Sequence, residues 1–95
     1  MKRLTEEQKQ EIERRTLDVV REQVATSRVP GTGDRLRADL EFDSLDMAEL
    51  AMELEEEFIV TIPAERLSHK TPDMTVGELI TLAQEIVAEQ EGDAA

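Results

Sequence analysis

The 95-residue chain contains no cysteine, tryptophan or tyrosine, and it has only two phenylalanines. Without cysteine it can form no disulfide, and it can supply neither a thiolate metal ligand nor a cysteine nucleophile. Because aromatic side chains are so few, the core has to be built from Leu, Ile, Val, Ala and Met, a mixture that suits packed helices. A domain of this size buries roughly 60–68% of its unfolded surface, which leaves no room for a deep enzyme cleft.

Long apolar segments are also missing. No apolar run approaches the ~20 residues that cross a membrane. Residues 1–6 carry charges without an apolar signal region behind them. We therefore expect a cytoplasmic protein with no membrane span, and we expect it to be a monomer.

Basic residues are scarce in the middle of the chain. The net charge is −12, from 23 acidic and 11 basic residues. Between Arg37 and Arg66 there are ten Asp and Glu residues but no Lys or Arg. Such a surface repels nucleic acid and anionic membranes, and it attracts basic protein surfaces. The expected partners are therefore proteins and not nucleic acids.

The apolar pattern predicts an all-α fold, a four-helix bundle with three longer helices, one short helix and a long first loop. Thr5-Glu6-Glu7-Gln8 fits a capping box, and it opens a first helix that we expect from about Thr5 to about Ser27. One Pro and two Gly in residues 29–34 then end this helix. Leu36 and Leu40 are expected to anchor the loop that follows.

The second helix is expected to open at Asp43-Ser44. Asp43 is a good N-cap, and Asp46 adds favourable charge to the first turn. At helical spacing, the apolar residues fall on one face, which comprises Met47, Leu50, Ala51, Leu54 and Phe58. The opposite face is an acidic stripe formed by Asp46, Glu49, Glu53, Glu56 and Glu57, with Leu45 and Met52 at its edge. The segment is strongly amphipathic.

The rest of the chain predicts a connector and two helices. Residues 58–63 read as a connector, because no second strand candidate exists to pair with them. A short helix fits Pro63–Leu67, with Pro in its first turn. Thr75-Val76-Gly77-Glu78 is a second capping box, and it opens a last helix that ends near Glu91. The chain is thus one domain over residues 1–95, with a core from about 4 to 91 and a frayed tail at 92–95.

Conventional catalytic groups are nearly absent. The single histidine, His69, lies in a polar loop, where a solvated role is the ordinary one. Neither a calcium loop nor a Gly-rich phosphate loop occurs, and one His without Cys disfavours zinc. Ser44 remains: a serine in a first helical turn is ordinarily structural, but free amides and the helix dipole there favour a phosphate. We expect no enzyme activity and no metal site.

One run of residues resembles the signature of acyl carrier proteins. It comprises Asp43-Ser44-Leu45-Asp46, Glu49-Leu50, Met52, residues 54–58 and Ile62-Pro63, with Asp39-Leu40 before it and Thr75-Val76 after it. The resemblance covers about Leu36 to Ile86. It implies that Ser44 carries 4′-phosphopantetheine, donated by coenzyme A, and that Asp43, Leu45 and Asp46 form the recognition motif. The arm's thiol would hold the acyl group as a thioester, in a chain that has no thiol of its own.

The resemblance also implies a docking surface on the second helix, formed by Leu45, Asp46, Glu49, Met52, Glu53, Glu56 and Glu57. Its partners would be a phosphopantetheinyl transferase and ketosynthase, dehydratase, reductase and acyltransferase-type enzymes with basic patches. The function implied is an acyl carrier in fatty acid biosynthesis, itself not an enzyme. Two alternatives stay open: a specialised carrier for a polyketide, aminoacyl or other lipid pathway, and a cofactor-free acidic helical adaptor.

Three features depart from the family's pattern. Glu41 stands where Gly is frequent, and Ile59 stands where Gly or Asp is usual after the Phe. Residues 67–74 look longer than usual and contain Pro72. A left-handed conformation at Ile59 would be unfavourable for a β-branched residue. We therefore expect either a different end to the second helix or an apolar contact made by Ile59.

Overall fold

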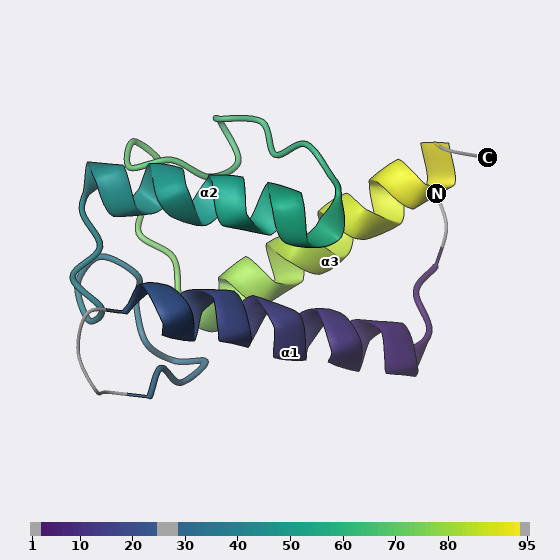
Figure 1. The fold of residues 1–95 in the computed structure, drawn as a ribbon, viewed down its shortest axis with the longest axis horizontal. Helices are drawn as coiled ribbons and strands as arrows, with labels where there is room; N and C mark the ends of the chain where they lie inside the picture. Colours follow the sequence, from purple (N-terminus) through teal and green to yellow (C-terminus); the bar gives the residue numbers. More distant parts are fainter. Residues whose placement is uncertain (1–2, 25–28, 94–95) are drawn as a thin grey trace.

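The computed structural model describes residues 3–24 and 29–93, with side chains as far as residue 90. These residues form three helices and no strand: α1 (Glu6–Gln23), α2 (Ser44–Phe58) and α3 (Val76–Asp93). α1 and α2 run in opposite directions, and α3 crosses behind them (Figure 1). The prediction of an all-α fold with three longer helices is confirmed.

Both predicted capping boxes are present. In front of α1, the Gln8 amide donates to Thr5 Oγ1 at 3.1 Å, and the Thr5 amide donates to Gln8 Oε1 at 2.9 Å. In front of α3, the Glu78 amide donates to Thr75 Oγ1 at 3.1 Å, and the Thr75 amide donates to Glu78 Oε1 at 3.0 Å. These bonds satisfy amides that the first turn of a helix leaves without a backbone partner.

The ends of α1 and α3 differ from the prediction. α1 ends at Gln23, because the backbone of Val24 turns to an extended conformation with φ −68° and ψ 125°. The expected last residues of this helix, 25–27, lie outside the described residues. α3 is helical through Asp93, slightly beyond the end expected near Glu91.

Turns occupy the segment for which a short helix was predicted, residues 63–67. The Arg66 amide donates to the Pro63 carbonyl at 2.9 Å, which closes a single turn. A stretch of five residues offers too few hydrogen bonds to offset the nucleation of a helix. Leu67, only 3% exposed, anchors this connector to the core.

The core lies where the three helices meet. Met47, Leu50 and Leu54 of α2 are at most 2% exposed, so the predicted apolar face of this helix does point inward. α1 and α3 contribute further apolar side chains, namely Ile12, Val19, Val20, Leu79, Ile80, Leu82, Ile86 and Val87. Leu36 and Leu40 are buried as expected, and they hold the first loop against the core. In the described part of the chain, no helix is long and apolar enough to cross a bilayer.

Ile59 ends α2 in a left-handed conformation, with φ 54° and ψ 55°. Its amide donates to the Glu55 carbonyl, as in the cap that helices usually complete with glycine. The side chain is 91% exposed. The expectation of a different helix end or of a burying apolar contact is therefore wrong on both counts. The helix keeps the usual left-handed end and places an isoleucine there.

Replacing Ile59 by Gly should raise the free energy of unfolding by about 1 kcal/mol, because glycine adopts the left-handed region without a Cβ clash. Urea and thermal unfolding would measure the change. Ala48→Gly, at an exposed position inside α2, is the matched control and should lower stability by about 1 kcal/mol. A loss of stability in Ile59→Gly would contradict the left-handed assignment.

Candidate functional site

Ser44 is the first residue of α2, and its side chain is exposed. It lies at the end of the bundle where the first loop and the last part of the α2–α3 connector meet (Figure 1). A helix start presents free backbone amides and the positive end of the helix dipole, both of which favour a phosphate. The predicted position of Ser44 at a helix start is confirmed.

Asp43 and Asp46 exchange hydrogen bonds on either side of Ser44. The Asp46 amide donates to Asp43 Oδ1 at 2.9 Å, and the Asp43 amide donates to Asp46 Oδ2 at 3.0 Å. The bond from the Asp46 amide is the main cause that lowers the pKa of Asp43 below its ordinary value. Asp43, and not Ser44, thus supplies the side-chain cap of α2, and Ser44 is exposed beside it.

A comparison with known families covers this part of the chain. The family described as "Phosphopantetheine attachment site" matches residues 14–83, which is most of the chain. The chain belongs to this family. Its phosphopantetheine-binding domain is an attachment site for covalently bound 4′-phosphopantetheine. No solved structure matches the chain.

Asp73 ties together two loops beside the start of α2 in this phosphopantetheine-binding domain. No sequence motif marks this aspartate. Asp73 Oδ1 accepts from the Arg37 amide at 3.0 Å, and Asp73 Oδ2 accepts from the Ala38 amide at 3.1 Å. The Arg37 guanidinium lies 3.6 Å from Asp73 Oδ1, and it also donates to the carbonyl of His69 at 2.6 Å and to that of Thr71. The first loop is thereby fastened to the connector that precedes α3.

Backbone hydrogen bonds strengthen the same junction. The Leu36 amide donates to the Met74 carbonyl at 2.9 Å, and the Val76 amide donates to the Asp34 carbonyl at 2.8 Å. Partial burial acts to raise the pKa of Asp73, but the bonds from two backbone amides and the nearby guanidiniums outweigh it and lower that pKa. The carboxylate is therefore held in its charged form at the centre of the junction.

The segment immediately before the capping box is strained. Glu41 has φ 60°, and it stands where Gly is frequent in the family that the chain resembles. It leads into Phe42, which is 5% exposed and whose amide donates to the Leu36 carbonyl at 3.0 Å. Among the described residues, Glu41 and Ile59 are the only non-glycine residues with positive φ. These two residues depart from the family's pattern, and both have the left-handed backbone conformation that favours glycine.

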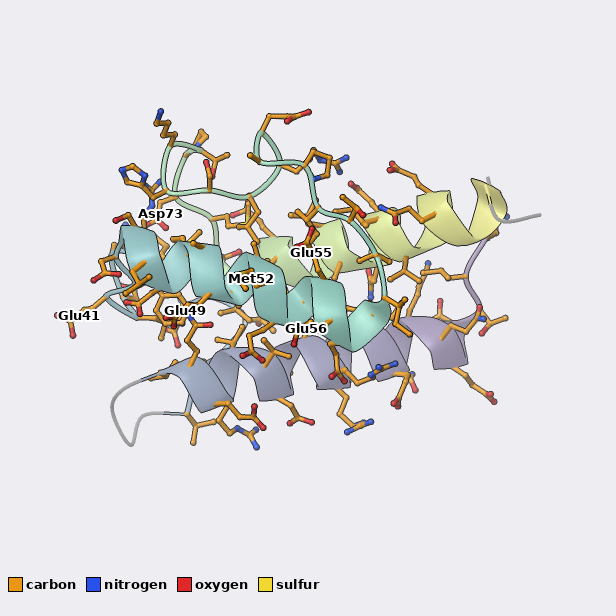
Figure 2. The ribbon with its side chains drawn as sticks, turned by 45° about the horizontal axis from the view of Figure 1, so that its top comes forward. Glu41, Glu49, Met52, Glu55, Glu56 and Asp73 are labelled. Carbon is orange, nitrogen blue, oxygen red and sulfur yellow. The ribbon has the colours of Figure 1, made fainter. Side chains whose placement is uncertain are left out.

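The acidic stripe of the phosphopantetheine-binding domain lies open along α2, as Figure 2 shows for Glu49, Met52 and Glu56. Glu49, Glu53 and Glu56 are exposed. Leu45 and Met52, the apolar members of the predicted docking surface, are 64% and 59% exposed. In the described residues, no group of three or more His, Cys, Asp or Glu is placed to hold a metal ion.

Two members of the predicted docking surface have partners inside the domain. The Glu57 carboxylate accepts from Arg15 Nε of α1 at 2.7 Å, so it faces α1 and not the open side of α2. The Asp46 carboxylate takes part in the capping box. The structure therefore brings Leu45, Met52 and three glutamates together on one open face, with Glu57 turned away from it.

Replacing Asp73 by Ala should lower the free energy of unfolding by about 2 kcal/mol at pH 7, because two loop amides lose a charged acceptor. The pKa of Asp73 is lower in the folded protein than its ordinary value of 3.8. Its contribution is therefore present above that ordinary value and disappears as the pH falls through the folded-state pKa. Urea unfolding of both proteins at neutral and strongly acidic pH should show the difference shrinking in acid.

The matched control is Asp73→Asn, which keeps one acceptor oxygen without the charge and should lose less stability than Asp73→Ala at neutral pH. A wild-type advantage over Asp73→Ala that is equally large in acid would contradict the charged role of this carboxylate.

Proposed function

We propose that this domain is an acyl carrier protein that bears 4′-phosphopantetheine on Ser44 and serves fatty acid biosynthesis in the cytoplasm. The observation that carries the proposal is an exposed serine hydroxyl at the start of α2, within the residues that match the phosphopantetheine attachment family. When bound, the group supplies the thiol that holds the acyl chain, which this cysteine-free chain cannot supply. The domain presents its cargo, and its partners perform the catalysis.

The chain's own residues fix where the group is attached. The Asp43–Asp46 capping box starts the helix and exposes Ser44 at the first position. The free amides and the dipole of α2 favour the negative phosphate that would link to Ser44 Oγ. The junction at Asp73 restrains the loop that leads to this residue. Together these contacts hold the attachment point in one place while the arm moves.

The exposed part of the acidic stripe suits brief encounters with many enzymes. Exposed ion pairs are each worth only ~0–1 kcal/mol, so they give little lasting affinity. A row of carboxylates does accelerate association with basic patches. Leu45 and Met52 offer apolar contact beside the row. This combination fits a carrier that visits a transferase, a ketosynthase, a dehydratase, a reductase and an acyltransferase in turn.

Incubation of the apo protein with coenzyme A, magnesium and a broad-specificity transferase should add one phosphopantetheine group, read by intact mass. Ser44→Ala should abolish the mass shift and leave the helical circular dichroism nearly unchanged, because Asp43 still caps α2. Ser68→Ala, in the connector, is the matched control and should be modified like the wild type.

If the wild type stays unmodified while a known carrier is loaded under the same conditions, the carrier proposal fails and the cofactor-free adaptor replaces it. If Ser44→Ala still gains the mass, attachment occurs at another hydroxyl.

Reversing the charge at Glu49 and Glu53 to Lys should slow association with a basic partner such as the transferase about tenfold or more at low salt, mainly through the on-rate. The same variant should show a flatter dependence on ionic strength. Stopped-flow or surface-binding kinetics would measure both effects. Glu13→Lys with Glu65→Lys changes the net charge equally at exposed positions away from α2, and it should slow association less. Equal slowing by both pairs would assign the effect to net charge and not to this face.

A further inference from the structure

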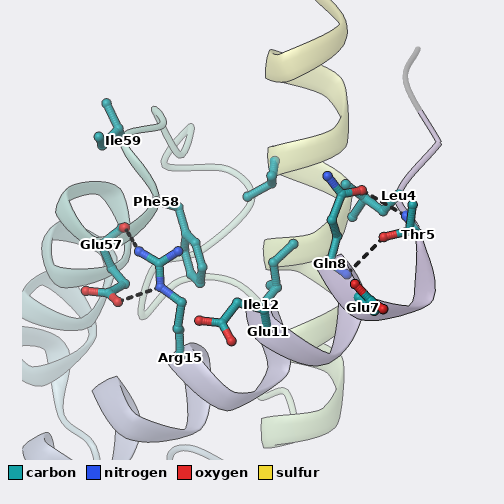
Figure 3. A pocket seen from close by; sticks show the side chains of 11 residues that line it. Leu4, Thr5, Glu7, Gln8, Glu11, Ile12, Arg15, Glu57, Phe58 and Ile59 are labelled. Carbon is teal, nitrogen blue, oxygen red and sulfur yellow. Dashed lines mark hydrogen bonds and ion pairs between the residues drawn. The ribbon is translucent and has the colours of Figure 1, made fainter.

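A groove of about 570 Å³ lies between the start of α1 and the end of α2 (Figure 3). Its apolar lining comes from Leu4, Ile12, Phe58 and Val87. Phe58 follows Ser44 by 14 positions along α2, which is about 21 Å at 1.5 Å per residue. The groove is therefore separate from the attachment site and from the start of the acidic stripe.

The rim of the groove is acidic. Three carboxylates line it, those of Glu7, Glu11 and Glu57, against one guanidinium, that of Arg15. Arg15 is already engaged, because its Nε donates to Glu57 at 2.7 Å and its guanidinium carbon lies 4.9 Å from the centre of the Phe58 ring. Glu11 forms an exposed ion pair with Arg14, which is not among the residues that line the groove. With Arg14 counted, three carboxylates face two guanidiniums, so an occupant of the groove meets an apolar floor and a rim of small net negative charge.

Ile59 stands at the edge of this groove and is the strongest single indication that something binds there. It is held in a left-handed conformation, and its side chain is 91% exposed. Nothing in the described residues buries that side chain, so folding gains little from it. Residues held in strained backbone conformations cluster at functional sites, ligand-binding positions among them. A partner that covers Ile59 would supply the burial that the domain itself does not.

We infer that this groove is a second docking surface, which takes a protein segment carrying an apolar side chain flanked by Lys or Arg. The apolar floor with Ile59 would receive the apolar side chain. Glu7 would meet the cations first, and Glu11 and Glu57, already paired with Arg14 and Arg15, would add to the negative potential of the rim. A second copy of this chain fits poorly, because two domains of net charge −12 repel one another. The inference concerns the apo protein and stands independently of the proposed carrier function.

The test uses the 15N-labelled full chain in its apo form, titrated with two synthetic helical peptides of equal length and charge. One is an amphipathic Leu/Lys peptide, and the other has Ser in place of Leu. The Leu/Lys peptide should saturably shift the amide signals of Leu4, Ile12, Phe58 and Ile59. The Ser/Lys peptide should bind about tenfold more weakly, since it has no apolar face to bury.

Variants separate the groove from the acidic stripe. Ile59→Ser should weaken binding of the Leu/Lys peptide at the groove about fivefold or more, without a loss of thermal stability. Glu49→Lys with Glu53→Lys should leave the affinity at the groove within about twofold, because these residues lie outside it.

Five results would overturn the inference. The shifts could be confined to the acidic stripe, or both peptides could bind the groove equally, or Ile59→Ser could bind like the wild type. Sedimentation could show a dimer that Ile59→Ser abolishes, or the holo protein could show the same groove shifts without any peptide. The last two outcomes would show that the groove is occupied by a second copy of the chain or by the phosphopantetheine arm with its cargo.

Discussion

The hydrogen bonds that Asp43 and Asp46 exchange determine the residue at which α2 begins, and the rest of the domain is arranged around that choice. They place Ser44 first in the helix, exposed and free of any capping duty. From this start the helix buries Met47, Leu50 and Leu54 in the core, and that burial sets its rotation. The glutamates between these residues then point outward.

Features that depend on neighbours in the sequence could be predicted, and features that depend on distant contacts could not. Two capping boxes, the N-cap at Asp43 and the apolar period predicted all three helix starts, and the motif around Ser44 singled out the candidate site. The junction at Asp73 joins residues 36 positions apart, and no local pattern marks such a pair. The turns at residues 63–67 were not predicted for a related reason. Pro63 allows a helix to start there, but only tertiary contacts decide whether that helix continues.

The two residues with left-handed backbones could be predicted only in part. Family resemblance indicated that Glu41 stands where Gly is frequent and Ile59 where Gly or Asp is usual. It did not indicate whether the backbone keeps the conformation that glycine permits. The structure keeps it at both, with φ 60° and φ 54°. The packing on either side explains this: buried Phe42 follows Glu41, and Val60 packs against the core directly after Ile59. Moving either turn would displace a core residue, and that costs more than the strain of one left-handed residue.

The two ends of α2 are therefore stabilised in opposite ways, and this bears on how one small domain could serve several partners. The first turn is over-determined by the capping box and by the loops tied at Asp73, so the proposed attachment residue stays in place. The last turn ends in a strained, exposed residue beside an open groove. Because α2 is a continuous helix, a contact at its far end can orient the whole helix without touching Ser44. Such an arrangement would let one partner hold the domain while another reaches the arm.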